Sequence, residues 1–164
     1  MLAVTSVAGN IFIDRRLSEK YRRAKAAGKC ERLAISRMEV ERLRLRRRTD
    51  RGTDVGIVLE PGSKLHHGDV LAAERFIVIE QLPEKVVTIG IKKDDIKQMV
   101  GLAALIGHTI GNRHRPIAVN NGVISFPVQV ESEVDTFKNL LPAGVKLKVK
   151  EQLFIPFGEV HSHE

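Results

Sequence analysis

The sequence predicts an α+β protein with a small all-β domain at residues 1–82 and a second domain at residues 83–154 that mixes strands and helices. Three observations lead to this division. Short apolar segments separated by turn residues fill the first part, whereas clear helical spacing of apolar residues begins in the second. Pro83 interrupts regular structure between them. The net charge of +7 is uneven, because residues 1–80 carry 17 Lys or Arg and only 11 Asp or Glu.

Short strands are expected in the first domain at residues 11–13, 40–46, 54–59 and 75–79, and no helix is expected there. The basic segment 20–29 is interpreted as a loop or a short helical turn. Alternation places Leu43 and Leu45 on one face of a strand, and the opposite face holds Arg42, Arg44 and Arg46. These arginines either protect a sheet edge from pairing or bind an acidic partner, and the sequence leaves both interpretations open.

The second domain shows a strand at 86–91, a helix from Asp94-Asp95 to Gly111, and a hairpin around Asn121-Gly122. The apolar face of the helix is expected to comprise Ile96, Met99, Val100, Ala103 and Ile106. A second helix capped by Ser132 and a strand at 145–150 follow. The order of strand, helix, strand, strand, helix and strand predicts a ferredoxin-like βαββαβ fold. Residues 155–164 are expected to form a flexible tail.

The composition excludes several classes of protein. No apolar run approaches the roughly 20 residues of a membrane helix, and the first residues lack the pattern of an export signal, so we expect a cytoplasmic protein without membrane partners. One cysteine, Cys30, excludes an internal disulfide and a multi-cysteine metal site. The sequence contains no Gly-x-Ser-x-Gly, Walker or His-Glu-x-x-His motif, so we expect no enzyme.

The histidines are the candidate metal ligands, although a single loop histidine such as His114 is more often only a solvated or hydrogen-bonded side chain. His114 follows Gly111-Asn112-Arg113 and precedes Pro116, on a short connection that we expect Gly111 to begin in the left-handed conformation. His161 and His163 are two residues apart, so in an extended chain both imidazoles can face one ion. Imidazoles suit divalent Ni, Cu and Zn, and an open site without thiolates suits a carrier. Two His114 side chains across a two-fold axis would double the ligands, which makes a homodimer plausible.

The other histidines have simpler interpretations. His66 and His67 are expected in a solvated loop, and His108 is expected to interact with the dipole of its helix. The basic first half also suggests a second function, a nucleic-acid-binding module. Only 4% of the residues are aromatic, which argues against base stacking and therefore against nucleic-acid binding.

The motifs resemble those of a known family. Gly111-Asn112-Arg113-His114 with Pro116 resembles the signature of the urease accessory nickel chaperones, the UreE family. In the first half, Arg42 and Arg44 leading into residues 49–56, and then residues 68–71, are similar to the N-terminal domain of that family. The resemblance covers nearly the whole chain.

The resemblance implies a peptide-binding first domain and a metal-binding second domain, with His114 at a dimer interface. His161 and His163 fall where the family carries further ligands. Ni(II) would be the cargo, with Zn(II) or Cu(II) able to occupy the site in vitro. Urease apoprotein and the accessory GTPase would be the partners. The two-histidine tail argues against nickel storage, and residues 123–130 contain no auxiliary histidine.

Overall fold

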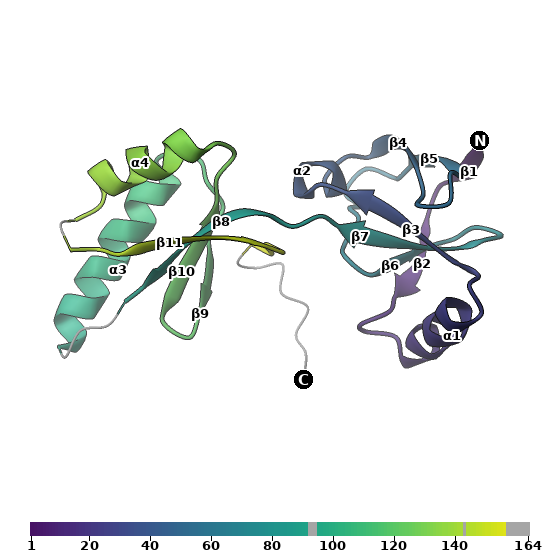
Figure 1. Ribbon diagram of the computed structural model, residues 1–164, viewed down its shortest axis with the longest axis horizontal. Helices are drawn as coiled ribbons and strands as arrows, with labels where there is room; N and C mark the ends of the chain where they lie inside the picture. Colours follow the sequence, from purple (N-terminus) through teal and green to yellow (C-terminus); the bar gives the residue numbers. More distant parts are fainter. Residues whose placement is uncertain (92–94, 143, 157–164) are drawn as a thin grey trace. The chain divides into compact units, whose positions relative to one another are not determined.

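The computed structural model describes residues 1–91, 95–142 and 144–156. The chain divides into two compact units, which meet in the sequence between Leu82 and Pro83. Both contain strands and helices, so the predicted mixed α+β class is confirmed (Figure 1). None of the helices within the described ranges is long and apolar enough to cross a membrane. The tail expected at 155–164 lies, from residue 157 on, outside the described residues.

The first unit contains two sheets. The three-stranded sheet has the order β1 (Leu2–Val4), β5 (Asp54–Val58) and β4 (Arg44–Arg48). The four-stranded sheet has the order β2 (Val7–Asn10), β6 (Asp69–Leu71), β7 (Phe76–Gln81) and β3 (Cys30–Ile35). The pairs β1–β5 and β3–β7 are parallel. Alternate apolar residues from both sheets form one core, which includes Val55, Ile57, Leu33, Ile77 and Ile79.

Helix α1 (Arg15–Ala26) covers the other side of the four-stranded sheet, so the prediction of no helix in this unit was wrong. Asp14 caps the helix by accepting hydrogen bonds from the N–H groups of Arg16 and Leu17, at 2.7 and 3.2 Å. Leu17, Tyr21 and Ala24 pack on the sheet. This apolar stripe is narrow and lies among basic residues, which is why the helical period was missed.

Two further differences concern this unit. Residues 11–13 form a turn rather than the predicted strand, because β2 ends at Asn10 and its side chain accepts the N–H of Phe12 at 2.9 Å. A short helix, α2 (Arg37–Val40), follows β3, and Ser36 and Glu39 form a capping box at its start.

The second unit follows the predicted order of elements. It consists of β8 (Glu84–Gly90), α3 (Ile96–Gly111), β9 (Ala118–Asn120), β10 (Val123–Pro127), α4 (Glu131–Leu140) and β11 (Leu147–Gln152). The antiparallel sheet has the order β11-β8-β10-β9. Both helices cover one face of this sheet (Figure 1). Residues from both helices and the sheet share the core, among them Ile89, Phe126, Ile106, Ile110 and Phe137.

One prediction about these helices was wrong. Helix α4 begins at Glu131, so Ser132 lies inside it and is not the cap. The predicted apolar face of α3 is only partly buried, because the side chains of Ile96 and Val100 are 76% and 64% exposed. The sheet covers only the stripe that contains Ile106 and Ile110, and the apolar surface of α3 is wider than that stripe.

Candidate metal centre

The chain leaves helix α3 through a Schellman type of turn that ends at His114. The carbonyl of Ile110 accepts the N–H of Arg115 at 3.4 Å, and the carbonyl of Gly111 accepts the N–H of His114 at 2.8 Å. These are the two hydrogen bonds of that motif, and the residue in its left-handed position is usually glycine. Here His114 occupies that position, with a φ of 52°.

The expectation that Gly111 would take the left-handed conformation was therefore wrong. Gly111 is the last residue of α3 and is not among the residues of positive φ. A left-handed conformation is uncommon for a side chain with a Cβ, and for histidine it costs of the order of 1 kcal/mol. The fold holds His114 in this conformation, and strain of this kind is often found at functional sites.

An ion pair fixes the residue that follows His114. The guanidinium of Arg115 contacts the carboxylate of Glu133 in the first turn of α4, and both side chains are about three-quarters or more buried. The second oxygen of Glu133 accepts the backbone N–H of Gln129 at 2.8 Å. The turn is thus attached at one end to α3 through its backbone and at the other to α4 through Arg115, and His114 is presented from a rigid support.

The imidazole of His114 is exposed and makes no hydrogen bond or ion pair with the described part of the chain. In contrast, Nε2 of His108 lies 2.9 Å from Nδ2 of Asn112. Within the described ranges, no group of three or more His, Cys, Asp or Glu side chains could hold a metal. The two other predicted ligands, His161 and His163, lie outside the described residues.

His66 and His67 lie in the loop before β6, as expected, but both are half-buried and bonded to the first unit, so the expectation that they are solvated was wrong. Nδ1 of His67 accepts the backbone N–H of Gln81 at 3.1 Å, and its ring stacks on Phe12 with centroids 5.3 Å apart. Burial lowers the pKa of His67. Nδ1 of His66 lies 3.5 Å from the carboxylate of Asp69, which is buried. Both histidines are therefore structural.

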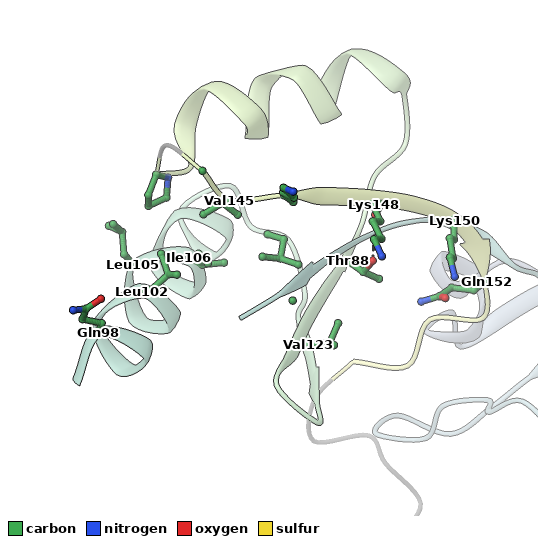
Figure 2. Close-up of a pocket in the computed structure, with 16 residues that line it drawn as sticks. Thr88, Gln98, Leu102, Leu105, Ile106, Val123, Val145, Lys148, Lys150 and Gln152 are labelled. Carbon is green, nitrogen blue, oxygen red and sulfur yellow. Dashed lines mark hydrogen bonds between the residues drawn. The ribbon is translucent and has the colours of Figure 1, made fainter. Parts of the chain in front are cut away.

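The second unit also contains a shallow groove of about 980 Å³ (Figure 2). Leu102 and Leu105 of α3 line one end, and Thr88, Lys148 and Lys150 of the open sheet face line the other. No histidine is among the described residues that line it, so it does not contribute to the site at His114.

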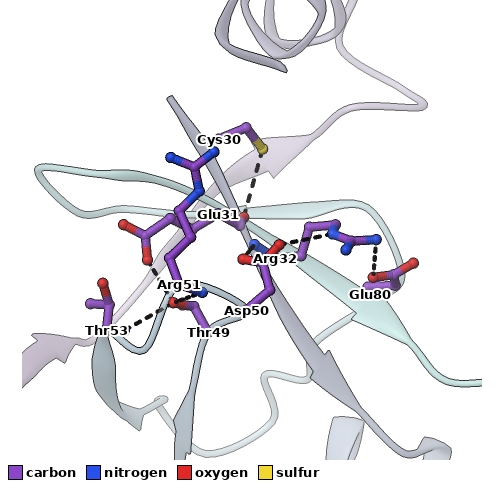
Figure 3. Close-up of polar contacts among 8 residues, drawn as sticks. All are labelled: Cys30, Glu31, Arg32, Thr49, Asp50, Arg51, Thr53 and Glu80. Atoms are coloured by element: carbon purple, nitrogen blue, oxygen red, sulfur yellow. Dashed lines mark hydrogen bonds and ion pairs between the residues drawn. The ribbon is translucent and has the colours of Figure 1, made fainter. Parts of the chain in front are cut away.

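The first-unit motif at residues 49–54 forms a polar network that links the two sheets (Figure 3). Thr49 Oγ1 donates to the buried carboxylate of Glu31 at 2.6 Å, and Arg75 donates to the same carboxylate at 2.8 Å. Burial alone would raise the pKa of Glu31, but hydrogen bonds from Thr49, Thr53 and Arg75 outweigh it and lower the pKa. This motif is therefore structural, and the sequence did not indicate its partners on other strands.

The three arginines predicted to bind a partner do not share one strand face. Arg42 lies before β4, and only Arg44 and Arg46 lie on its exposed face. Arg46 makes two hydrogen bonds to the carboxylate of Asp54, at 3.0 and 2.8 Å. One of the three arginines of the predicted basic face is therefore already paired with a carboxylate. The larger basic surface is on α1, whose residues 20–26 the sequence marked as basic but not as part of a long helix.

Comparison with known proteins supports the motif-based resemblance. A family model described as UreE urease accessory protein, N-terminal domain, matches residues 13–81. The urease accessory protein UreE of Natronomonas pharaonis is 31% identical, over 100% of this chain and 81% of the relative. UreE 1 of Pseudomonas syringae pv. tomato is 30% identical, over 87% of this chain and 93% of the relative. UreE of Bacillus sp. strain TB-90 is 32% identical, over 71% and 74% of the two chains.

These matches define an accessory protein of urease rather than an enzyme. The chain belongs to the UreE family.

Proposed function

We propose that this protein is a metallochaperone that binds Ni(II) and helps to deliver it to urease apoprotein while the urease metallocentre is assembled. In this proposal residues 83–154 form the ferredoxin-like metal-binding domain, and residues 1–82 dock protein partners. The partners are urease apoprotein and the accessory GTPase, and the protein acts in the cytoplasm. Membership of the UreE family supports a role in urease maturation.

The observation that carries the nickel assignment is the position of His114. Its exposed imidazole projects from a turn that is attached to both α3 and α4. No side chain in the described ranges makes a hydrogen bond or an ion pair with its nitrogen atoms. Imidazole nitrogen is a good ligand for Ni(II), and Zn(II) or Cu(II) can use the same donor. An exposed site with few protein ligands allows release, which a carrier requires.

A homodimer supplies the ligands that one chain lacks. His114 of one copy would face His114 of a second copy across a two-fold axis, with His161 and His163 as further ligands. The exposed side chains of Ile96 and Val100 on α3 support this arrangement, because a second copy would remove their apolar surface from water. The metal site and the dimer interface would then both belong to the second unit.

Titration calorimetry with Ni(II) tests the proposal. We expect about one tight site per dimer in the native protein and loss of that site in His114→Ala. The matched control is His108→Ala, which removes another exposed imidazole of the same unit and should leave the affinity unchanged. The affinity should fall as the pH is lowered, because protons compete with the metal for the imidazole nitrogen. Unchanged affinity in His114→Ala would remove His114 as the ligand.

A further inference from the structure

Helix α1 and its flanks carry most of the positive charge of the first unit. Residues 14–29 contain seven Lys or Arg and two acidic residues, a net charge of +5. Because Leu17, Tyr21 and Ala24 hold the helix on the sheet, the charged side chains face away from it. Seven cations are exposed in this segment, namely Arg15, Arg16, Lys20, Arg22, Arg23, Lys25 and Lys29.

Almost none of this charge is neutralised within the unit. Arg15 lies 3.5 Å from Glu19, but their side chains are 92% and 45% exposed, and such pairs contribute little. Among the described residues, Arg16, Arg22 and Arg23 make no ion pair. The arginines of β4 differ, because Arg46 is paired with Asp54 and Arg47 with Glu39. Arg44 and Arg48 of β4 are exposed and without an ion pair among the described residues, but the largest group of unpaired cations in one short segment is that of α1.

The stability of the helix does not account for all of these charges. Cations near the C-terminus, such as Arg23 and Lys25, interact favourably with the helix dipole. Arg15 and Arg16 stand in the first turn, where the positive end of the dipole disfavours them, and that turn contains no acidic residue. Two arginines at an unfavourable position indicate a role outside the fold.

Two exposed apolar side chains lie directly before the helix. Phe12 is 50% exposed and Ile13 is 63% exposed. The ring of Phe12 stacks on the ring of His67, and this contact fixes its orientation. Arginine and aromatic side chains together are typical of the central residues of protein interfaces. The one aromatic residue of α1 itself, Tyr21, packs on the sheet, so the helix offers no stacking surface for nucleic-acid bases.

We propose that the outer face of α1, with Phe12 and Ile13, is a docking surface for an acidic region of a partner protein. We define this α1 surface by Phe12, Ile13, Arg15, Arg16, Arg22 and Arg23. The guanidinium groups pair with carboxylates, which they can bind through two parallel hydrogen bonds, and the apolar pair enters a pocket beside them. The charge pattern of α1 is the main evidence for this docking surface. The inference rests on the proposed function only in the choice of the partner proteins to be tested.

The test measures binding of purified urease apoprotein and purified accessory GTPase to the full chain loaded with Ni(II). Arg16→Glu/Arg23→Glu changes the α1 surface. Lys148→Glu/Lys150→Glu makes the same change of net charge on exposed lysines of the second unit and is the control. We expect the α1 variant to weaken binding of at least one partner more than tenfold, and the control to weaken it less than twofold. Ile13→Ala, which leaves the charge unchanged, should also weaken it.

Three results would overturn the docking surface. These are equal losses in the two charge variants, no loss in the α1 variant, and failure of both proteins to bind the native chain. Binding of a 20-base-pair DNA duplex is measured as well, and duplex binding that is tighter than protein binding and steeply salt-dependent would be a fourth result against the docking surface. Calorimetry with Ni(II) on the same variants should show unchanged metal binding. If His114→Ala bound Ni(II) as the native protein does, while the α1 variant still lost partner binding, the proposed function would be contradicted and the docking surface would stand.

Discussion

The carboxylate of Asp50 accepts two hydrogen bonds from Arg32, one from its backbone N–H at 2.8 Å and one from Nε at 3.0 Å (Figure 3). The backbone N–H of Asp50 in turn donates to the carbonyl of Arg32 at 2.9 Å. Arg32 lies on β3 of the four-stranded sheet, whereas Asp50 lies in the turn between β4 and β5 of the three-stranded sheet. These bonds hold the pKa of Asp50 below its usual value, mainly through the backbone N–H of Arg32.

Replacement of Asp50 should therefore loosen the junction of the two sheets. We expect Asp50→Ala to lower the free energy of unfolding by about 1–2 kcal/mol, because a backbone N–H loses its acceptor. Urea denaturation followed by circular dichroism measures this. The control is Asp54→Ala, which removes a carboxylate paired with Arg46, an exposed side chain, and should cost less. Equal losses in the two variants would show that the junction has no special role.

The sequence predicted the second unit better than the first for a physical reason. In the second unit, core residues such as Ile106, Ile110, Val134 and Phe137 recur at helical spacing, and Asn121-Gly122 marks the hairpin, with Asn121 at a φ of 47° as such a turn requires. Local patterns of this kind can be recognised in the sequence without knowledge of the fold. Helix α1 also has an apolar stripe at helical spacing, Leu17, Tyr21 and Ala24, but the stripe is narrow and the basic residues around it hid the pattern.

The candidate site shows the same limit. The sequence placed His114 on a short connection after a helix, but it assigned the left-handed conformation to Gly111, because glycine adopts it most readily. The position is set instead by the hydrogen bonds from the carbonyls of Ile110 and Gly111 and by the ion pair of Arg115 with Glu133. That pair spans 18 residues, and no local spacing rule indicates it.

The half-buried ring of His67 should make stability depend on pH. Burial lowers its pKa in the folded protein, although the carboxylate of Glu80 opposes this effect. The unfolded chain therefore takes up the proton first. The stability contributed by neutral His67 is complete above the unfolded pKa of about 6.5 and is lost as the pH falls through the lower folded pKa.

His67→Asn should remove this dependence, because asparagine can still accept the N–H of Gln81 but does not titrate in this range. Unfolding free energies measured between pH 7.5 and pH 5 should fall more steeply in the native protein than in the variant. His108→Asn, which replaces an exposed histidine, should retain the native slope. A native slope in His67→Asn would assign the effect to another group.

The left-handed conformation of His114 predicts an unusual order of stabilities. Glycine adopts a φ of 52° without strain, whereas alanine does not, so His114→Gly should be more stable than His114→Ala by about 1 kcal/mol. Thermal unfolding of the metal-free proteins measures the difference. Both variants lack the imidazole and should lose Ni(II) binding equally. If the alanine variant were as stable as the glycine variant, the turn in solution would differ from the one described here.

The ion pair between Arg115 and Glu133 should determine how rigidly His114 is held. In Glu133→Gln the amide side chain can still accept the N–H of Gln129, but it no longer pairs with the charge of Arg115. Loss of that attachment leaves the turn held only by its backbone hydrogen bonds to α3, and we expect faster hydrogen exchange at the amides of His114 and Arg115. Glu131→Gln is the matched control, because Glu131 is exposed in the same turn of α4 and makes no ion pair with the described residues. Exchange that is equally fast in both variants would mean that the charge of α4, and not this contact, protects the turn. Protection unchanged in Glu133→Gln would mean that the Schellman hydrogen bonds alone hold His114.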